Sequence, residues 1–312
     1  MSLPEFRDRL FILSQYCIPQ HTLSRLIGYL ADCENLWLKS KIIQLFSHFF
    51  PINMAEAERE NHEQYASFND FFTRELKAGA RPIVQDENAI ASPADGAISE
   101  IGIIEKDQLL QAKGHKYSLL ALLGGDTALA EQFNNGAFAT IYLSPKDYHR
   151  VHMPLAGRLQ KTLYVPGKLF SVNQTTANNV PGLFARNERL VCVFETDCGP
   201  MVVILVGAMI VAAIETVWAG QVAPQSKKVN AIDLTKTIEL EKGGEMGRFK
   251  LGSTAIVLFP ENTVTWNETL ENGSQLFGYA QQEKDASFLC LYASDFIDEK
   301  VKANYRLITL VD

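Results

Sequence analysis

The sequence predicts an α+β protein in which an N-terminal amphipathic helical region precedes a mostly antiparallel β domain. Helical periodicity dominates residues 1–80. From Arg81 onward, short apolar runs are punctuated by proline and glycine, which is typical of strands and turns. Strands do not alternate regularly with long helices, and this argues against a doubly wound parallel sheet. The predicted division is a helical region over 1–80 and a β-rich domain over 81–312.

The helical region contains two apolar segments and one capped helix. Four leucine and isoleucine residues recur at helical spacing within 23–30, and residues 36–50 are rich in aromatic and aliphatic side chains. These faces either pack on the core or lie in a membrane interface, and the sequence leaves both readings open. Ser67 is predicted to cap a short helix that begins at Phe68.

The β domain is predicted from a series of apolar runs and one helical interval. The helical interval is 127–133. The longest apolar run, 201–214, is too short to span a bilayer as a helix and is interrupted by Gly207, so it predicts two buried strands. The strand candidates after the helical interval are 138–143, 190–194, 201–205, 210–217, 237–240 and 254–259.

Charge and cysteine usage exclude several classes of protein. The chain of 312 residues has a formal charge of −7, which argues against nucleic acid as a partner because phosphate binding needs a basic surface. Its five cysteines form no Cys-x-x-Cys pair, and no histidine cluster completes a metal site. We therefore expect reduced, structural thiols and no bound metal.

The pair Gly252-Ser253 offers the most specific chemistry. It reads as a tight turn that leads into a buried strand. The Ser253 hydroxyl could attack the unshielded carbonyl of Gly252 if a base removed its proton. A Gly-Ser pair is also common in surface turns, so the rest of the chain must supply the base.

Two histidines and one aspartate are candidates to complete such a set. His149 and His152 follow a proline turn that could direct both into one cleft, although they could equally be ordinary turn residues. Asp95 stands at the tip of a turn before Gly96 and could orient an imidazole, as the third member of a Ser-His-Asp set does. Aspartate before glycine is otherwise a common turn residue.

Further glycine-bearing polar turns contain His115, Lys168 and Ser171. Each of these side chains could contact an anionic head group, and each could belong to a plain loop. We therefore treat them as candidate substrate-binding residues that the sequence alone does not separate from loop residues.

Several motifs in a fixed order resemble one family. The motifs are Phe68-Asn69, Phe71-Phe72, Arg81-Pro82-Ile83, Pro93-Ala94-Asp95-Gly96, Asp147 to His152, Phe184 to Arg189, Glu215 to Gly220 and Leu251-Gly252-Ser253-Thr254. Together they are similar to phosphatidylserine decarboxylase, in particular its bacterial membrane-associated type, over about residues 65–260. The tail after about residue 265 matches nothing that assigns it a role.

The resemblance implies an enzyme that makes its own prosthetic group. His152, oriented by Asp95, would take the proton of Ser253, and the chain would cut itself between Gly252 and Ser253. Residue 253 would become a pyruvoyl group, with no metal and no pyridoxal phosphate, and residues 1–252 and 253–312 would remain together as larger and smaller subunits. The group would decarboxylate phosphatidylserine to phosphatidylethanolamine and carbon dioxide, with His149 handling the substrate carboxylate or a proton.

The resemblance also implies partners and a location. The enzyme would meet phosphatidylserine at the membrane surface, as a peripheral protein on the cytoplasmic face of the cell membrane. The resemblance leaves open whether it forms a homo-oligomer. Two rival readings are a serine hydrolase that uses intact Ser253, His152 and Asp95, and a non-catalytic β domain that binds at a membrane surface. Against the hydrolase interpretation, the sequence around Ser253 has no Gly-x-Ser-x-Gly motif, which forms the nucleophile elbow of many serine hydrolases.

Overall fold

The computed structural model describes most of the chain. The described residues are 3–84, 86, 89–209, 213–222, 228–232, 236–250, 253–266, 270–276, 291–292 and 308–309. Gly252, and with it the expected cleavage bond, lies outside the described residues, as do Cys290 and most of the tail.

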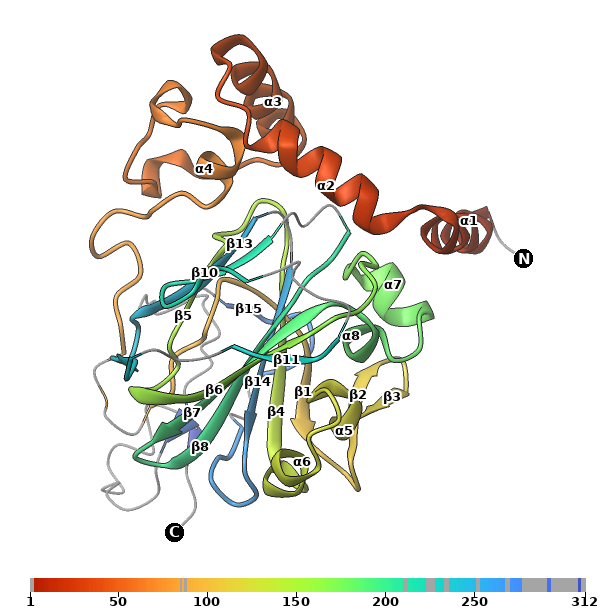
Figure 1. The fold of residues 1–312 in the computed structure, drawn as a ribbon, viewed down its shortest axis with the longest axis vertical. Coiled ribbons are helices and arrows are strands. Elements are labelled where there is room, and N and C mark those ends of the chain that lie inside the picture. Colours follow the sequence, from red (N-terminus) through yellow and green to blue (C-terminus); the bar gives the residue numbers. More distant parts are fainter. Residues whose placement is uncertain are drawn as a thin grey trace.

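The N-terminal helices lie together at one end of the molecule, above the sheets (Figure 1). Ser67 accepts a hydrogen bond from the backbone nitrogen of Asp70, so the predicted cap is confirmed. Its hydroxyl satisfies one of the free N–H groups of the first turn. The helices are α1 (Leu3–Cys17), α2 (Gln20–Ala31), α3 (Leu36–Phe49) and α4 (Phe68–Phe72), with short 3-10 turns at Met54–Glu56 and His62–Gln64.

The buried face of α2 consists of one glutamine and three small residues. Gln20, Ser24, Gly28 and Ala31 are buried, whereas Leu26 and Leu30 are more than half exposed. The core-packing reading of the 23–30 face is therefore wrong for these two leucines. The buried side of α2 is therefore not its leucine side, and Leu26 and Leu30 lie on the exposed side.

A large antiparallel sheet forms the centre of the β domain. Within the described residues it has nine strands, in the order β11-β6-β7-β8-β14-β4-β1-β15, with β12 also pairing with β6. The mostly antiparallel α+β prediction is confirmed. The strands are β1 (Gly96–Ile103), β4 (Ala137–Leu143), β6 (Gly157–Val165), β7 (Arg189–Thr196), β8 (Gly199–Val206), β11 (Asn230–Ala231), β12 (Glu239–Leu240), β14 (Ser253–Phe259) and β15 (Gln275–Leu276).

A smaller antiparallel sheet packs on one face of the large sheet. Its order is β10-β9-β13-β5, and its side chains share one apolar core with the inward residues of β7, β8 and β14. Because strand residues alternate between faces, Ala255 and Val257 join this core while Ile256 and Leu258 join the core on the other side. The strands are β5 (Arg150–His152), β9 (Ala213–Thr216), β10 (Gly220–Gln221) and β13 (Glu245–Lys250).

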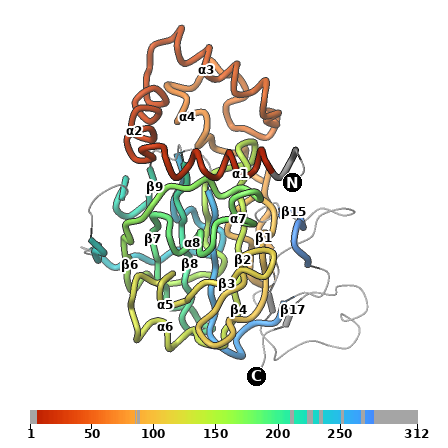
Figure 2. The backbone as a smooth tube through the Cα atoms, turned by 90° about the vertical axis from the view of Figure 1, so that its right-hand side faces the viewer, coloured from red at the N-terminus to blue at the C-terminus, as the bar shows by residue number. Residues whose placement is uncertain are grey.

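Short helices and one hairpin cover the opposite face of the large sheet (Figure 2). The predicted helix 127–133 is present with the same bounds. Two further short strands, β16 (Leu291–Tyr292) and β17 (Ile308–Thr309), pair in parallel. The covering elements are β2 (Gln108–Ala112), β3 (His115–Ser118), α5 (Leu119–Leu122), α6 (Thr127–Phe133), α7 (Gln174–Asn179) and α8 (Leu183–Arg186).

The strand predictions agree with the structure to within a few residues. The apolar run 201–214 divides into β8 and β9 on either side of Gly207, as predicted. Among the described residues, none of the helices combines the length and apolar character needed to cross a bilayer. The four described cysteines, Cys17, Cys33, Cys192 and Cys198, are free thiols.

Candidate functional site

The chain passes twice, side by side, between the two sheets. β4 of the large sheet leads to β5 of the small sheet, and β13 of the small sheet leads back to β14 of the large one. β14 pairs with β4, and β13 pairs with β5, so the two connections run antiparallel. Ser253 opposes Leu143, and the nitrogen of Phe249 donates to the carbonyl of His149 over 3.0 Å. The candidate serine and the candidate histidines are therefore brought to the same crossing by the topology.

Ser253 is the first residue of β14 and is completely buried. Its exposed fraction is 0%, and its Oγ has no hydrogen-bond partner among the described residues. The neighbouring Thr254 is equally buried, and its hydroxyl is also unpartnered there. Buried hydroxyls are normally hydrogen-bonded because an unmade bond costs about 1–3 kcal/mol. Ser253 therefore begins β14 with a buried hydroxyl that no described group satisfies.

His149 lies at the crossing with one ring nitrogen free to accept a proton. Its Nδ1 is 2.9 Å from the carbonyl oxygen of Asp147, and a carbonyl can only accept, so the proton is on Nδ1. Its Nε2 is buried without a partner in the described chain. Burial, aided by the nearby charge of Arg74, lowers the pKa of His149 from 6.5 to about 3. The imidazole is consequently neutral at physiological pH.

His152 has different neighbours from His149. Its Nδ1 is 2.9 Å from the carbonyl of Gly243, which again places the proton on Nδ1, and its Nε2 is 3.1 Å from the hydroxyl of Tyr148. Burial lowers the pKa of His152 to about 3, so this ring is neutral as well. A neutral imidazole is the form that accepts a proton from serine.

Asp95 lies beside the end of β5 and is held by an arginine. The nitrogen of His152 donates to the carbonyl of Pro93 over 2.8 Å, which places the turn with Asp95 next to that strand. The buried carboxylate forms a salt bridge of 2.8 Å with Arg81, which also pairs with Glu56. The expected orientation of His152 by Asp95 remains a prediction.

The structure adds one residue that the sequence reading missed. Arg74 is 4% exposed, and its Nη2 donates to the carbonyls of Lys146 and Asp147. Its Nε and Nη1 are buried and have no partner in the described part of the chain. Burial lowers the pKa of this guanidinium. The available signal was a single arginine two residues after the aromatic pair Phe71-Phe72, since a charge next to buried side chains is itself brought into the interior.

The N-terminal region contributes a wall of the site as well as a charge. The ring of Phe72 in α4 packs on the imidazole of His149 with 4.0 Å between ring centroids. Arg150 on β5 donates to the carbonyl of Thr73 and pairs with Glu245 on β13 over 2.7 Å. These contacts connect the segment 72–74 to both strands that lead to the crossing.

The remaining candidates lie elsewhere. His115 begins β3 in the hairpin that covers the opposite face of the large sheet, away from β5. Lys168 lines a cavity below the junction of α1 and α2, and the nitrogen of Ser171 donates to Gln15 in α1. In the described residues, no group of three His, Cys, Asp or Glu side chains is placed to hold a metal ion.

The fold is that of an α+β protein in which the buried residues Ser253 and His149 lie at the crossing between two packed antiparallel sheets. The sequence model of the family described as phosphatidylserine decarboxylase matches residues 68–278, and a second model, described as PSD, matches residues 10–50.

Several bacterial proteins are similar to this chain over most of its length. A phosphatidylserine decarboxylase proenzyme of Pseudomonas aeruginosa (strain LESB58) is 59% identical over 269 residues, covering 85% of this chain and 93% of that protein. The proenzyme of Alcanivorax borkumensis is 60% identical over 273 residues, covering 86% and 94%. That of Ectopseudomonas mendocina is 58% identical over 284 residues, covering 88% and 99%. The chain therefore belongs to the phosphatidylserine decarboxylase family, and it is a decarboxylase.

Proposed function

We propose that the chain is a proenzyme that cuts itself between Gly252 and Ser253 and then decarboxylates phosphatidylserine to phosphatidylethanolamine and carbon dioxide. The observation that carries this proposal is the complete burial of Ser253 with an unpartnered Oγ. A hydrolase needs a nucleophile that its substrate can reach, whereas a buried serine is next to its own backbone carbonyl by covalent connection. Membership of a family of proenzymes supports the same conclusion.

The cleavage steps balance without an outside reagent other than water. A neutral imidazole accepts the proton of Ser253 Oγ, the oxygen bonds to the carbonyl carbon of Gly252, and the peptide C–N bond breaks to leave an ester and a free amine. Loss of the α-proton expels the Gly252 carboxylate and leaves dehydroalanine. Addition of water and release of ammonia then give a ketone at residue 253. The resemblance assigns the first proton transfer to His152, which must then give up its contact with the Tyr148 hydroxyl.

The residues at the crossing fit a pyruvoyl group derived from Ser253. The Cα of Ser253 would become the ketone carbon and its Cβ the methyl carbon, while the side-chain oxygen would leave with Gly252 and the ketone oxygen would come from water. When formed, the group supplies a carbonyl that takes up the substrate amine and accepts the electrons released with carbon dioxide. His149 Nε2 is available to hold a proton at the reacting carbon, and the two unpartnered nitrogens of Arg74 suit an anionic group of the substrate.

The order of strands supports retention of both fragments after the cut. β14 begins the smaller fragment and lies between β8 and β4, with both ladders running along most of its length. All seven residues of β14 are buried. Residues 253–312 would therefore stay bound to residues 1–252 as a smaller subunit.

The exposed apolar side chains of α3 support docking at a membrane, on the cytoplasmic face as the resemblance implies. Trp37 is 71% exposed and Leu45 is 61% exposed, although α3 also buries Ile43. Replacing Trp37 and Leu45 by serine should weaken sedimentation with phosphatidylserine vesicles by about tenfold or more, since each buried apolar side chain is worth about 1.5–3 kcal/mol. Gln44→Ser on the same helix is the matched control, and equal losses in both variants would contradict docking through α3.

Intact-mass measurement under denaturing conditions tests the proenzyme proposal. We expect two fragments, 1–252 and 253–312, and labelling of the smaller fragment alone by a carbonyl-reactive hydrazide. Ser253→Ala should remain one chain and form no phosphatidylethanolamine from phosphatidylserine vesicles, while Ser67→Ala, at another buried serine, should still be cut. An active wild-type protein that is one continuous chain would overturn the proposal.

A further inference from the structure

Tyr148 and His152 form a stacked and hydrogen-bonded pair around the start and end of β5. The centres of the two rings are 5.6 Å apart, and the ring planes are inclined by 28°. The hydroxyl of Tyr148 lies 3.1 Å from Nε2 of His152. Tyr148 is buried, and β5 is the edge strand of the small sheet. The two rings therefore restrict each other's orientation.

The direction of this hydrogen bond follows from the other nitrogen of the imidazole. Nδ1 of His152 is 2.9 Å from the carbonyl oxygen of Gly243, which can only accept, so Nδ1 carries the proton. Nε2 of the neutral ring is then an acceptor, and the hydroxyl of Tyr148 donates to it. Burial raises the pKa of Tyr148, so this hydroxyl keeps its proton. The lone pair with which His152 accepts a proton is thus already occupied.

The carbonyl that fixes Nδ1 is itself held in place. The nitrogen of Met153 donates to the carbonyl of Gly244, and the nitrogen of Gly243 donates to the carbonyl of Met153, both over 2.8 Å. These two bonds tie the residue after β5 to the residues that precede β13. The backbone therefore sets the tautomer of His152, because exchanging the roles of its two nitrogens would break the bond to Gly243.

The serine of the proposed cleavage is not bonded to this histidine. Oγ of Ser253 is buried and has no hydrogen-bond partner among the described residues, whereas Nε2 of His152 has the hydroxyl of Tyr148. A general base must come within hydrogen-bond reach of the proton that it removes. The proton transfer that begins self-cleavage therefore requires the tyrosine hydroxyl to leave Nε2 first. A proton relay through Tyr148 would instead need a hydrogen bond between the two hydroxyls, which Ser253 does not make.

The turn that precedes Tyr148 is closed on both sides. The nitrogen of Asp147 donates to the carbonyl of Ser144 over 2.9 Å, and its carboxylate accepts from the nitrogen of Ser144 over 2.7 Å. Nη2 of Arg74 donates to the carbonyls of Lys146 and Asp147 from the other side. Tyr148 is thus presented to His152 by a fixed segment of main chain.

We propose that Tyr148 is a positioning residue of the precursor, whose ring aligns His152 and whose hydroxyl occupies the nitrogen that must accept the proton of Ser253, so that self-cleavage is delayed. The inference rests on the proposed function, because it concerns the timing of the same cut. Release of one such hydrogen bond slows the cut about three- to tenfold. The delay gives β14 time to pair with β8 and β4, so that the smaller fragment is already bound when the chain is cut.

The test follows cleavage of the full chain made by cell-free synthesis. Labelled leucine is supplied briefly, and the conversion of 1–312 to 1–252 and 253–312 is followed on denaturing gels. Tyr148→Phe keeps the ring and removes only the hydroxyl, so it should be cut about three- to tenfold faster than the wild type. Site-specific 3-fluorotyrosine at position 148 keeps the ring and makes the hydroxyl a stronger donor, so it should be cut about twofold more slowly. Damage to the fold does not accelerate a cut.

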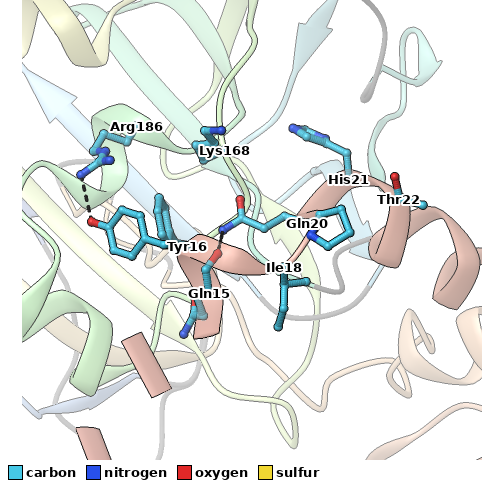
Figure 3. A pocket seen from close by; sticks show the side chains of 10 residues that line it. Gln15, Tyr16, Ile18, Gln20, His21, Thr22, Lys168 and Arg186 are labelled. Atoms are coloured by element: carbon cyan, nitrogen blue, oxygen red, sulfur yellow. Dashed lines mark hydrogen bonds between the residues drawn. The ribbon is translucent and has the colours of Figure 1, made fainter. Parts of the chain in front are cut away.

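Two other tyrosines provide matched controls. Tyr164 is 1% exposed, and its hydroxyl donates to Glu188 over 2.7 Å, so Tyr164→Phe removes a comparable buried hydrogen bond. Tyr16→Phe removes a hydroxyl that accepts from Arg186 beside the cavity at the junction of α1 and α2 (Figure 3). Both variants should be cut within about twofold of the wild-type rate.

Two outcomes would overturn the inference alone. The first is a Tyr148→Phe chain that is folded by circular dichroism and is cut no faster than the wild type, and a slower cut would make the hydroxyl a relay. The second is a 3-fluorotyrosine chain that is cut as fast as the wild type or faster, and this outcome decides the matter even if Tyr148→Phe does not fold. A wild-type chain that is never cut would instead refute self-cleavage itself, and the inference with it.

Discussion

Burial of His149 should make the protein lose stability as the pH falls below about 6.5. The ring is 0% exposed, and its pKa is about 3 in the folded chain against an ordinary value of 6.5. The unfolded chain therefore binds a proton over a pH range in which the folded chain does not. At pH 5, binding of this proton by the unfolded chain raises the equilibrium constant of unfolding about thirtyfold, which lowers the free energy of unfolding by about 2 kcal/mol. The stability that depends on the neutral His149 ring is fully present above pH 6.5 and is lost progressively as the pH falls toward 3.

Urea unfolding at pH 8 and pH 5 measures this effect. We would use the Ser253→Ala chain as the parent, so that every sample is a single polypeptide, and compare it with the same chain carrying His149→Gln. Both proteins lose stability on acidification for other reasons, but the parent should lose about 2 kcal/mol more between the two pH values. His48→Gln, at an exposed histidine of α3, should leave the parent's difference unchanged. Equal pH differences in the parent and the His149→Gln protein would refute the assignment of a buried, neutral imidazole.

Three further changes have definite expected outcomes. Arg81→Gln leaves the buried carboxylate of Asp95 without its salt bridge and should cost about 3 kcal/mol in urea unfolding, with much of the loss relieved by a second change, Asp95→Asn. Gly247→Ala would place a Cβ 2.3 Å from the carbonyl oxygen of Glu215, so it should destabilise the chain by about 3 kcal/mol and slow its cleavage in a time course on denaturing gels. Cys192 should resist iodoacetamide in the native protein and react only on unfolding, because burial raises the pKa of its thiol; rapid native labelling at this residue would contradict the buried strand.

The local features of the chain were predictable because they depend on neighbours in sequence. The apolar run 254–259 gave β14, the glycine at 207 divided the preceding run, and the residues 127–133 gave a helix with the observed bounds. Ser67 was recognisable as a cap from its type and position alone. The motif residues that carry the family resemblance also include Ser253 and both histidines, which the topology brings to one crossing.

Other features depend on contacts between distant residues, and the sequence pattern does not record them. The backbone carbonyl of Gly243 and the hydroxyl of Tyr148 hold His152 in place. Every residue has a backbone carbonyl, so the sequence could not indicate that the one at Gly243 binds this ring. Arg74 is a single charge that becomes significant only when it is buried beside residues 146–149. The exposed leucines of α2 show another limit of the sequence pattern. Periodicity identifies an apolar face of a helix, but it does not show that this face is the buried one.

The ring of Phe72 joins the two parts of this protein mechanically. One side of it packs on His149, and another contacts Phe46 of α3 with 5.8 Å between ring centroids. A fragment cut to contain only the sheets would keep every strand of the two sandwiched layers and yet lack the aromatic cover of this imidazole. The N-terminal helices thus also cover His149, and a movement of α3 would reach this imidazole through the ring of Phe72.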